Sequence, residues 1–115
     1  MKFEVRELGK AKADERQIFE WLNDRSRAGA TAWLAAYDKM IERLAENADA
    51  CGAAFECPEL EMEVKQAFFK TAKGRIYRAL FLVQSKEVFI LRVRGPGQAS
   101  VDASEIDDPQ MPTDI

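Results

Sequence analysis

Three extended apolar segments follow one another within residues 64–95, and they constrain the fold more than any other part of the chain. The first is marked by Phe68 and Phe69, the second covers 76–83 and the third covers 88–93. Tyr, Phe, Val and Ile dominate these segments, which is the composition of β-strands. Because only a few residues connect them, neighbouring strands must run antiparallel. The stretch therefore predicts a three-strand meander.

One strand and two helices are predicted before the meander. Residues 2–8 alternate between apolar and charged side chains, which indicates a short half-buried strand. Residues 14–27 begin with a pattern similar to a capping box and predict a helix whose apolar face includes Trp21. Residues 30–48 carry eight apolar residues in helical register, among them Trp33, and predict a second helix. We expect both tryptophans in the core.

This order of elements predicts an α+β fold with an antiparallel helical hairpin covering one side of the sheet. A chain of 115 residues fits one domain. We place that domain at residues 1–97 and an acidic, poorly packed tail at 98–115. Apolar runs fall well short of the ~20 residues of a membrane span, and the first residues do not resemble a secretion signal. These features favour a cytoplasmic protein.

Charge is unevenly distributed along the chain. The whole chain carries a net charge of −3, yet residues 65–94 hold eight basic residues and one acidic residue, a net charge of +7. Residues 95–115 hold five acidic residues and no basic ones. The predicted sheet is therefore basic, and the segment after it is acidic.

Histidine is absent and cysteine occurs only twice, at Cys51 and Cys57. Nucleophile pairs that use histidine are thus excluded, and a zinc site has too few ligands. In a reducing compartment we expect two free thiols. We predict no metal site and no cofactor.

The segment Tyr77-Arg78-Ala79-Leu80-Phe81 is similar to the "YRxxY/F" motif of the RelE/ParE toxin superfamily, also called plasmid stabilisation proteins. Residues 88–94 resemble the final strand of that family, and residues 44–58 resemble its helix-to-strand connection. The resemblance covers about residues 1–95. It implies a bacterial toxin of a type II toxin–antitoxin system, neutralised by a cognate antitoxin protein.

The resemblance implies one of two activities. RelE-like members cut messenger RNA on the ribosome with basic residues of the sheet, whereas ParE-like members inhibit DNA gyrase without nuclease chemistry. RNA cleavage requires cations that stabilise the developing phosphorane charge. For a RelE-like enzyme, Arg78 and Arg92 are the candidate catalytic residues. The candidate binding residues are Lys70, Lys73, Arg75 and Arg94.

The hairpin between the last two strands decides whether these arginines share a face. A three-residue loop at 84–86 places Arg78 opposite Arg92. A two-residue loop at 85–86 sends Arg92 and Arg94 to the other face. Each arginine also has a structural interpretation, as a soluble strand end or as one half of an internal salt bridge.

The acidic tail, the missing histidine and the sequence pI of about 5.1 favour a ParE-like binding protein over a nuclease. We therefore expect a toxin that contacts a cellular target such as DNA gyrase. The alternatives are a RelE-like endoribonuclease that acts on ribosome-bound mRNA and a non-toxic member that only binds a partner. A second copy of the chain is a further candidate partner.

Overall fold

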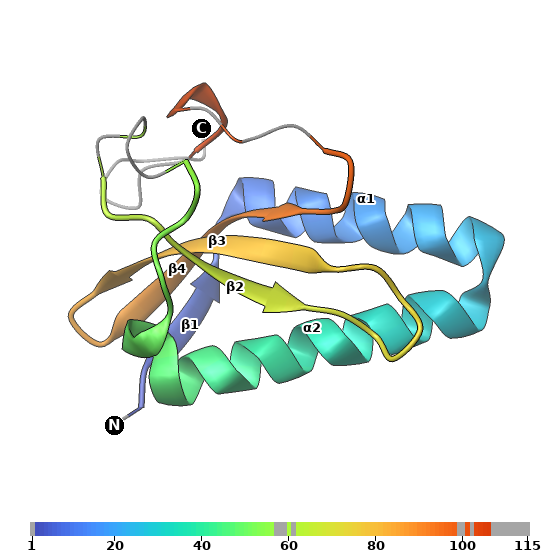
Figure 1. The fold of residues 1–115 in the computed structure, drawn as a ribbon, viewed down its shortest axis with the longest axis horizontal. Helices are drawn as coiled ribbons and strands as arrows, with labels where there is room; N and C mark the ends of the chain where they lie inside the picture. Colours follow the sequence, from blue (N-terminus) through green and yellow to red (C-terminus); the bar gives the residue numbers. More distant parts are fainter. Residues whose placement is uncertain (1, 57–59, 61, 99–100, 102, 107–115) are drawn as a thin grey trace.

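The predicted order of one strand, two helices and three strands is present in the structure, a computed structural model that describes residues 2–56, 60, 62–98, 101 and 103–106 (Figure 1). The elements are β1 (Glu4–Glu7), α1 (Gly9–Arg25), α2 (Arg27–Asn47), β2 (Lys65–Phe69), β3 (Tyr77–Gln84) and β4 (Glu87–Arg94), with short 3-10 helices η1 (Ala48–Ala50) and η2 (Ala103–Glu105). The α+β fold class is confirmed.

The four strands form one mixed sheet in the order β1-β4-β3-β2. β2, β3 and β4 are the predicted antiparallel meander, and β1 pairs in parallel with β4. The long connection through two helices and two strands makes this parallel pairing possible. β1 and β2 are therefore the two edges of the sheet.

The first helix begins five residues earlier than its sequence predicts. It starts at Gly9, after Leu8 in an extended conformation without a side-chain cap, so Asp14 is not a capping residue. The second helix follows after Ser26 alone, whose Oγ accepts a hydrogen bond of 3.0 Å from the backbone N–H of Gly29. This cap fixes the tight reversal between the two helices.

Both helices pack on one face of the sheet. The core between them contains Trp33, Tyr37 and Met40 of α2 together with Phe81 and Ile90 of the central strands, all at most 2% exposed. Burial of such large apolar side chains is the main stabilising contribution to the fold. The prediction for Trp33 is confirmed, whereas Trp21 is 54% exposed and the prediction that it lies in the core is wrong.

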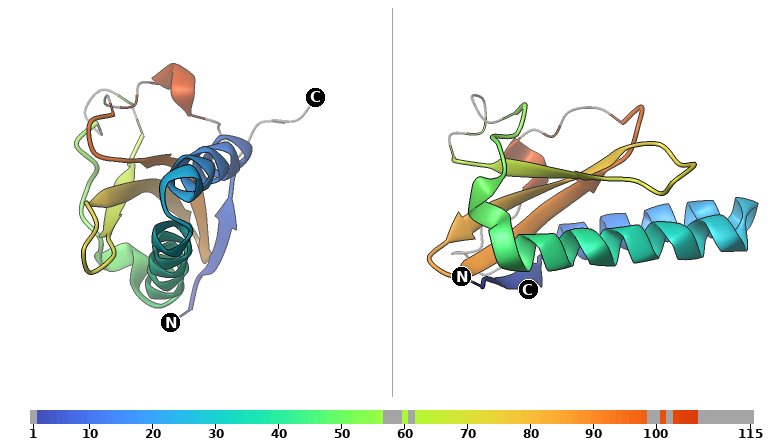
Figure 2. Two further views of the ribbon diagram at one scale, coloured as in Figure 1. Left: turned by 90° about the vertical axis from the view of Figure 1, so that its right-hand side faces the viewer. Right: turned by 60° about the horizontal axis from the view of Figure 1, so that its bottom comes forward.

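A second apolar cluster covers the other face of the sheet. It joins Leu80, Leu82 and Leu91 to residues of the 54–64 connection and to Val101, which is 3% exposed. The segment that contains η2 thus lies on the side of the sheet opposite to α2 (Figures 1 and 2). Residues 107–115 of the predicted tail and Cys57 lie outside the described residues, and the domain boundary at residue 97 stays a prediction. Cys51 is a free thiol.

Candidate functional site

The hairpin between β3 and β4 combines the two-residue turn with a β-bulge, so neither predicted register is complete. Gln84 pairs with Glu87 across the turn, where Ser85 has a φ of 57°. A register shift beside Leu80 then brings Arg78 opposite Arg94. The bulge adds one residue to β4, so the side chains of β4 after the bulge point to the sheet face opposite to the one that the turn alone would give them. Arg78, Arg92 and Arg94 consequently share the sheet face opposite to the helices.

Arg78 is held in a buried ion pair with Glu56. Its two terminal nitrogens bind the two carboxylate oxygens of Glu56, and Nη1 also donates to Gln66 Oε1 at 3.0 Å. Glu56 Oε2 accepts a further hydrogen bond of 2.9 Å from the N–H of Val101. The hydrogen bonds from Arg78 lower the pKa of Glu56 to about 2 despite its burial. The pair fastens the 51–64 connection and the C-terminal segment to the sheet.

Arg92 and Arg94 are paired with carboxylates as well. Arg92 binds Asp14 of α1 in a bidentate manner, with distances of 2.7 and 2.8 Å. Asp14 Oδ2 also accepts a hydrogen bond of 2.9 Å from the backbone N–H of Val93. Val93 lies in the part of β4 that continues past its pairing with β1. Arg94 forms an ion pair with the carboxylate of Glu105. The backbone carbonyl of Glu105 accepts a hydrogen bond of 2.9 Å from Arg92. Arg92 and Arg94, both predicted as site residues, therefore connect β4 to α1 and to the C-terminal segment.

These contacts bear on the predicted catalytic role of the arginines. The side chains of Arg78, Arg92 and Arg94 are 14%, 14% and 10% exposed, and each faces at least one carboxylate within the chain. A neutralised guanidinium has little field left to stabilise a phosphorane. The structure brings the two candidate catalytic residues to one face, and their catalytic role stays a prediction.

The remaining candidate binding residues lie together on the turn between β2 and β3. Lys70, Lys73 and Arg75 are all exposed, and none forms an ion pair with any residue in the described part of the chain. The turn extends alongside α2 (Figures 1 and 2). Three exposed cations that can contact a partner thus lie on this turn, in contrast to Arg78, Arg92 and Arg94 of the strands, which are paired within the chain.

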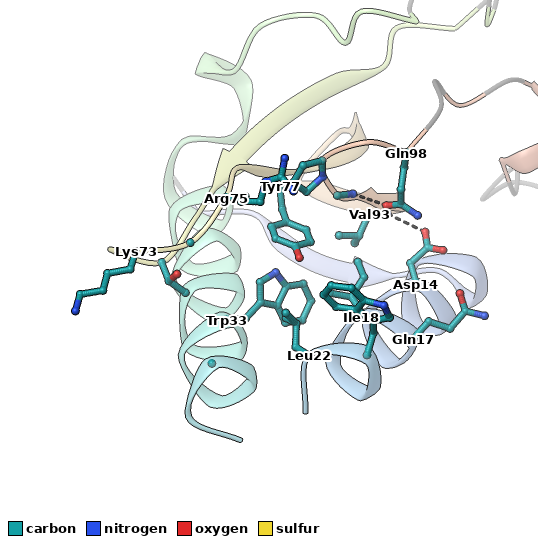
Figure 3. A pocket seen from close by; sticks show the side chains of 16 residues that line it. Asp14, Gln17, Ile18, Leu22, Trp33, Lys73, Arg75, Tyr77, Val93 and Gln98 are labelled. Carbon is teal, nitrogen blue, oxygen red and sulfur yellow. Dashed lines mark hydrogen bonds between the residues drawn. The ribbon is translucent and has the colours of Figure 1, made fainter. Parts of the chain in front are cut away.

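An open groove of about 600 Å³ separates this turn and the end of β4 from the helical hairpin (Figure 3). Most of its wall is apolar. Contributing side chains include Ile18, Trp21, Leu22, Trp33, Tyr77 and Val93, and the rim carries Lys73 and Arg75. One signal for the groove was present in the sequence but was misinterpreted: Trp21 follows the apolar period of α1, yet its side chain lies at the groove wall and is 54% exposed.

Two hydrogen-bond donors of the groove have no partner among the described residues. Trp33 is 2% exposed, yet its buried Nε1–H meets no acceptor in that part of the chain. The hydroxyl of Tyr77 makes no hydrogen bond with the described residues either. Burial raises the pKa of Tyr77, and the positive charge of Arg75 offsets part of this rise. An unpaired buried N–H is rare and costly, and here the indole packs edge to face against the ring of Tyr77, with the ring centroids 5.6 Å apart.

A separate polar cluster lies between β1, α1 and α2. The hydroxyl of Tyr37 donates to Glu7 Oε2 at 2.5 Å. Burial and the neighbouring Glu7 raise the pKa of Glu15 to about 8, and Asp38 adds to the shift. Burial followed by the hydrogen bond with Glu7 also raises the pKa of Tyr37. Within the described ranges, these and the other acidic residues nowhere form a group of three or more potential metal ligands.

The helices offer no route across a membrane: none of those in the described chain is both long and apolar enough to span one.

The chain matches no protein-family model and no curated protein sequence. It does resemble solved structures. One is a chain described as the chromosomal ParDE toxin–antitoxin (TA) system from P. aeruginosa, with a TM-score of 0.63 and 21% sequence identity over 82% of this chain and 96% of that chain. The protein therefore shares its fold with that chain of a ParDE system, in agreement with the fold that the resemblance in the sequence implied.

Proposed function

We propose that this protein is the toxin of a type II toxin–antitoxin system, of the ParE-like kind that acts in the cytoplasm by binding a target such as DNA gyrase. The fold likeness to a ParDE chain supports a toxin of this class. The proposal also names a partner, because the system in which that chain occurs contains an antitoxin. It assigns no reaction to the protein.

One observation carries the choice of binding over catalysis: the three strand arginines are consumed by internal ion pairs. Arg78 is bound to Glu56, Arg92 to Asp14 and Arg94 to Glu105. A RelE-like nuclease requires free cations on this face, where the scissile phosphate would lie. The arrangement instead leaves the cations of the β2–β3 turn for contact with a partner.

The groove is the proposed seat of the antitoxin. Its apolar wall fits the apolar side of a helical or extended segment, and the cations at its rim complement the acidic chains typical of antitoxins. A groove with Ile18, Leu22 and Trp33 on its wall provides the buried anchor that a stable interface needs. Neutralisation then follows if the segment covers the β2–β3 turn.

The test is to induce the chain in bacteria and to follow DNA synthesis and protein synthesis in parallel. We expect DNA synthesis to fail first, and purified protein to inhibit DNA supercoiling by gyrase. Charge reversal at Lys73 and Arg75 should weaken this inhibition, whereas reversal of Lys86, an exposed cation of the β3–β4 turn, should not.

Other outcomes separate the alternatives. An immediate fall in translation while replication continues would establish the RelE-like endoribonuclease and refute this proposal. Unaffected growth, with both syntheses intact, would instead indicate a non-toxic member that only binds a partner. Elution as a dimer, in the absence of antitoxin, would identify a second copy of the chain as an additional partner.

A further inference from the structure

Two large aromatic side chains are exposed next to each other at the edge strand β2. Phe55 is 70% exposed and Phe68 of β2 is 46% exposed. Their ring centroids are 6.2 Å apart, with the ring planes tilted by 47°. Single exposed apolar residues are ordinary, whereas neighbouring large ones indicate a contact surface. We call these two residues, together with Ile76, which is 58% exposed and immediately precedes β3, the apolar patch.

The apolar patch is an uncovered part of the sheet. Ala67 and Phe69 lie in the core beneath the helices, so Phe68 between them points to the opposite face. The connection before β2 covers this face at the start of the strand, where the N–H of Gln66 donates to the carbonyl of Gly52 at 3.0 Å (Figure 1). The end of β2 towards the β2–β3 turn is left exposed and available to a partner.

Phe55 has a fixed position despite its exposure. Its backbone N–H donates to Gln66 Oε1 at 3.4 Å, and the guanidinium carbon of Arg78 lies 5.3 Å from the centroid of its ring. The next residue, Glu56, is 4% exposed and is bound by Arg78. A side chain that is held in advance loses little entropy when a partner binds. The ion pair of Arg78 thus positions an exposed aromatic ring as an anchor.

Cations border the apolar patch along the chain. Lys70 follows Phe68 by two residues, and Arg75 immediately precedes Ile76. Both are exposed and have no carboxylate partner in the described chain. An acidic protein surface complements these charges, whereas a second copy placed patch to patch would bring two sets of cations together. The net charge of −3 disfavours a nucleic acid as the partner.

We propose that the apolar patch and the cations beside it contact the target protein of the toxin, at an acidic surface that carries an apolar side chain. The inference rests on the proposed function and extends it by naming the contact surface and the chemistry of the partner. The apolar side chain packs against Phe55 and Phe68, and carboxylates around it pair with Lys70 and Arg75. A few anchors of this kind carry most of the binding free energy of an interface.

The test measures how strongly the full-length chain inhibits DNA supercoiling by purified gyrase. Phe55→Ser and Phe68→Ser should each raise the concentration needed for half-maximal inhibition by about tenfold. Phe89→Ser is the matched control, because Phe89 is a half-buried residue near the β3–β4 turn, outside the patch. It should change that concentration by less than about twofold. Melting curves identify any variant that loses inhibition by unfolding, and if Phe68→Ser does so, Phe55→Ser decides.

A charge reversal tests the rim separately. Lys70→Glu should weaken inhibition by about tenfold, whereas Lys86→Glu, in the β3–β4 turn, should leave it unchanged. Equal inhibition by these two variants would overturn the acidic partner surface.

Undiminished inhibition by folded Phe55→Ser and Phe68→Ser would overturn the inference and leave the proposed function standing. If the wild type does not inhibit gyrase, that target is refuted and growth arrest on induction becomes the readout. Arrest that the patch variants lose would then support the inference with another target, and arrest that they keep would overturn it. A chain without any effect on growth would refute both.

Two further measurements exclude other occupants of the patch. Binding of a fluorescein-labelled oligothymidylate of about 12 nucleotides, lost in Phe55→Ser, would identify a nucleic acid and overturn the choice of a protein. Elution as a dimer that Phe68→Ser converts to a monomer would identify a second copy of the chain and overturn the inference as well.

Discussion

Glu56→Gln tests whether the strand arginines are structural. The side chain is 4% exposed, binds Arg78 through both oxygens and accepts from Val101 at 2.9 Å. Its pKa falls from an ordinary 4.5 to about 2, mainly because of the hydrogen bonds from Arg78. At about 1.4 kcal/mol for each pKa unit, that difference corresponds to roughly 3 kcal/mol of stability. Removal of one partner from a buried ion pair typically costs about 3–5 kcal/mol, and the value from the pKa shift lies in this range.

The sign of the pH dependence follows from the direction of the shift. Because the pKa of Glu56 is lower in the folded chain than in the unfolded chain, its contribution is complete above about pH 4.5 and is lost as the pH falls towards about 2. Urea unfolding of the wild type and the variant should therefore differ by about 3 kcal/mol at pH 7. The difference should shrink steadily below about pH 4.5.

Glu63→Gln is the matched control, because Glu63 belongs to the same connection but is exposed and has no ion pair in the described chain. It should change the free energy of unfolding by less than about 0.5 kcal/mol. A Glu56→Gln variant as stable as the wild type at pH 7 would refute the reasoning. So would a loss of stability that does not depend on pH, since the lost interaction would then not be electrostatic.

Two further substitutions probe the polar cluster and the edge of the groove. Glu15→Gln should stabilise the chain at pH 8–9 and have little effect near pH 4. The pKa of Glu15 is raised to about 8 in the folded chain, so the wild type loses stability as the pH rises from about 4.5 to 8, and the variant does not. A difference in the free energy of unfolding that stays constant across this pH range would contradict the raised pKa. Gly95→Ala should lower stability by about 1–3 kcal/mol, because the added Cβ would lie 2.8 Å from the Tyr77 ring, whereas Gly52→Ala meets no atom within 4 Å. Equal melting temperatures for these two alanine variants would contradict the packing at Gly95.

The elements of the fold were predictable because their signals are local. Alternating or continuous apolar residues identified the strands, and the helical period identified α2 with Trp33 in the core. The start of α1 was not predictable from Asp14, whose side chain is a good cap in isolation. Here it instead binds Arg92, 78 positions away in the chain. A tertiary contact decided the use of that residue.

The arrangement of the arginines depended on a feature without a sequence signal. The two-residue turn was one of the two predicted loops, but the bulge at Leu80 then shifted the register by one position. A shift of one residue moves every following side chain to the other face of the sheet. The two-residue turn predicted Arg92 and Arg94 on the face opposite to Arg78, but because of the bulge they lie on the same face as Arg78. The extra residue of the bulge is on β4, where Leu91 joins the second apolar cluster.

Position in the fold explains why the strand arginines and the turn cations have different fates. A charge inside an apolar strand is costly unless it is paired, so the fold supplies Glu56, Asp14 and Glu105 from three separate segments. A charge on an exposed turn carries no such cost and needs no partner from the chain. Lys73 and Arg75 of the β2–β3 turn, which have no carboxylate partner in the described chain, border the groove. We expect an acidic segment from another protein to meet these cations, which is why the groove and not the strand arginines is the place to test the proposed function.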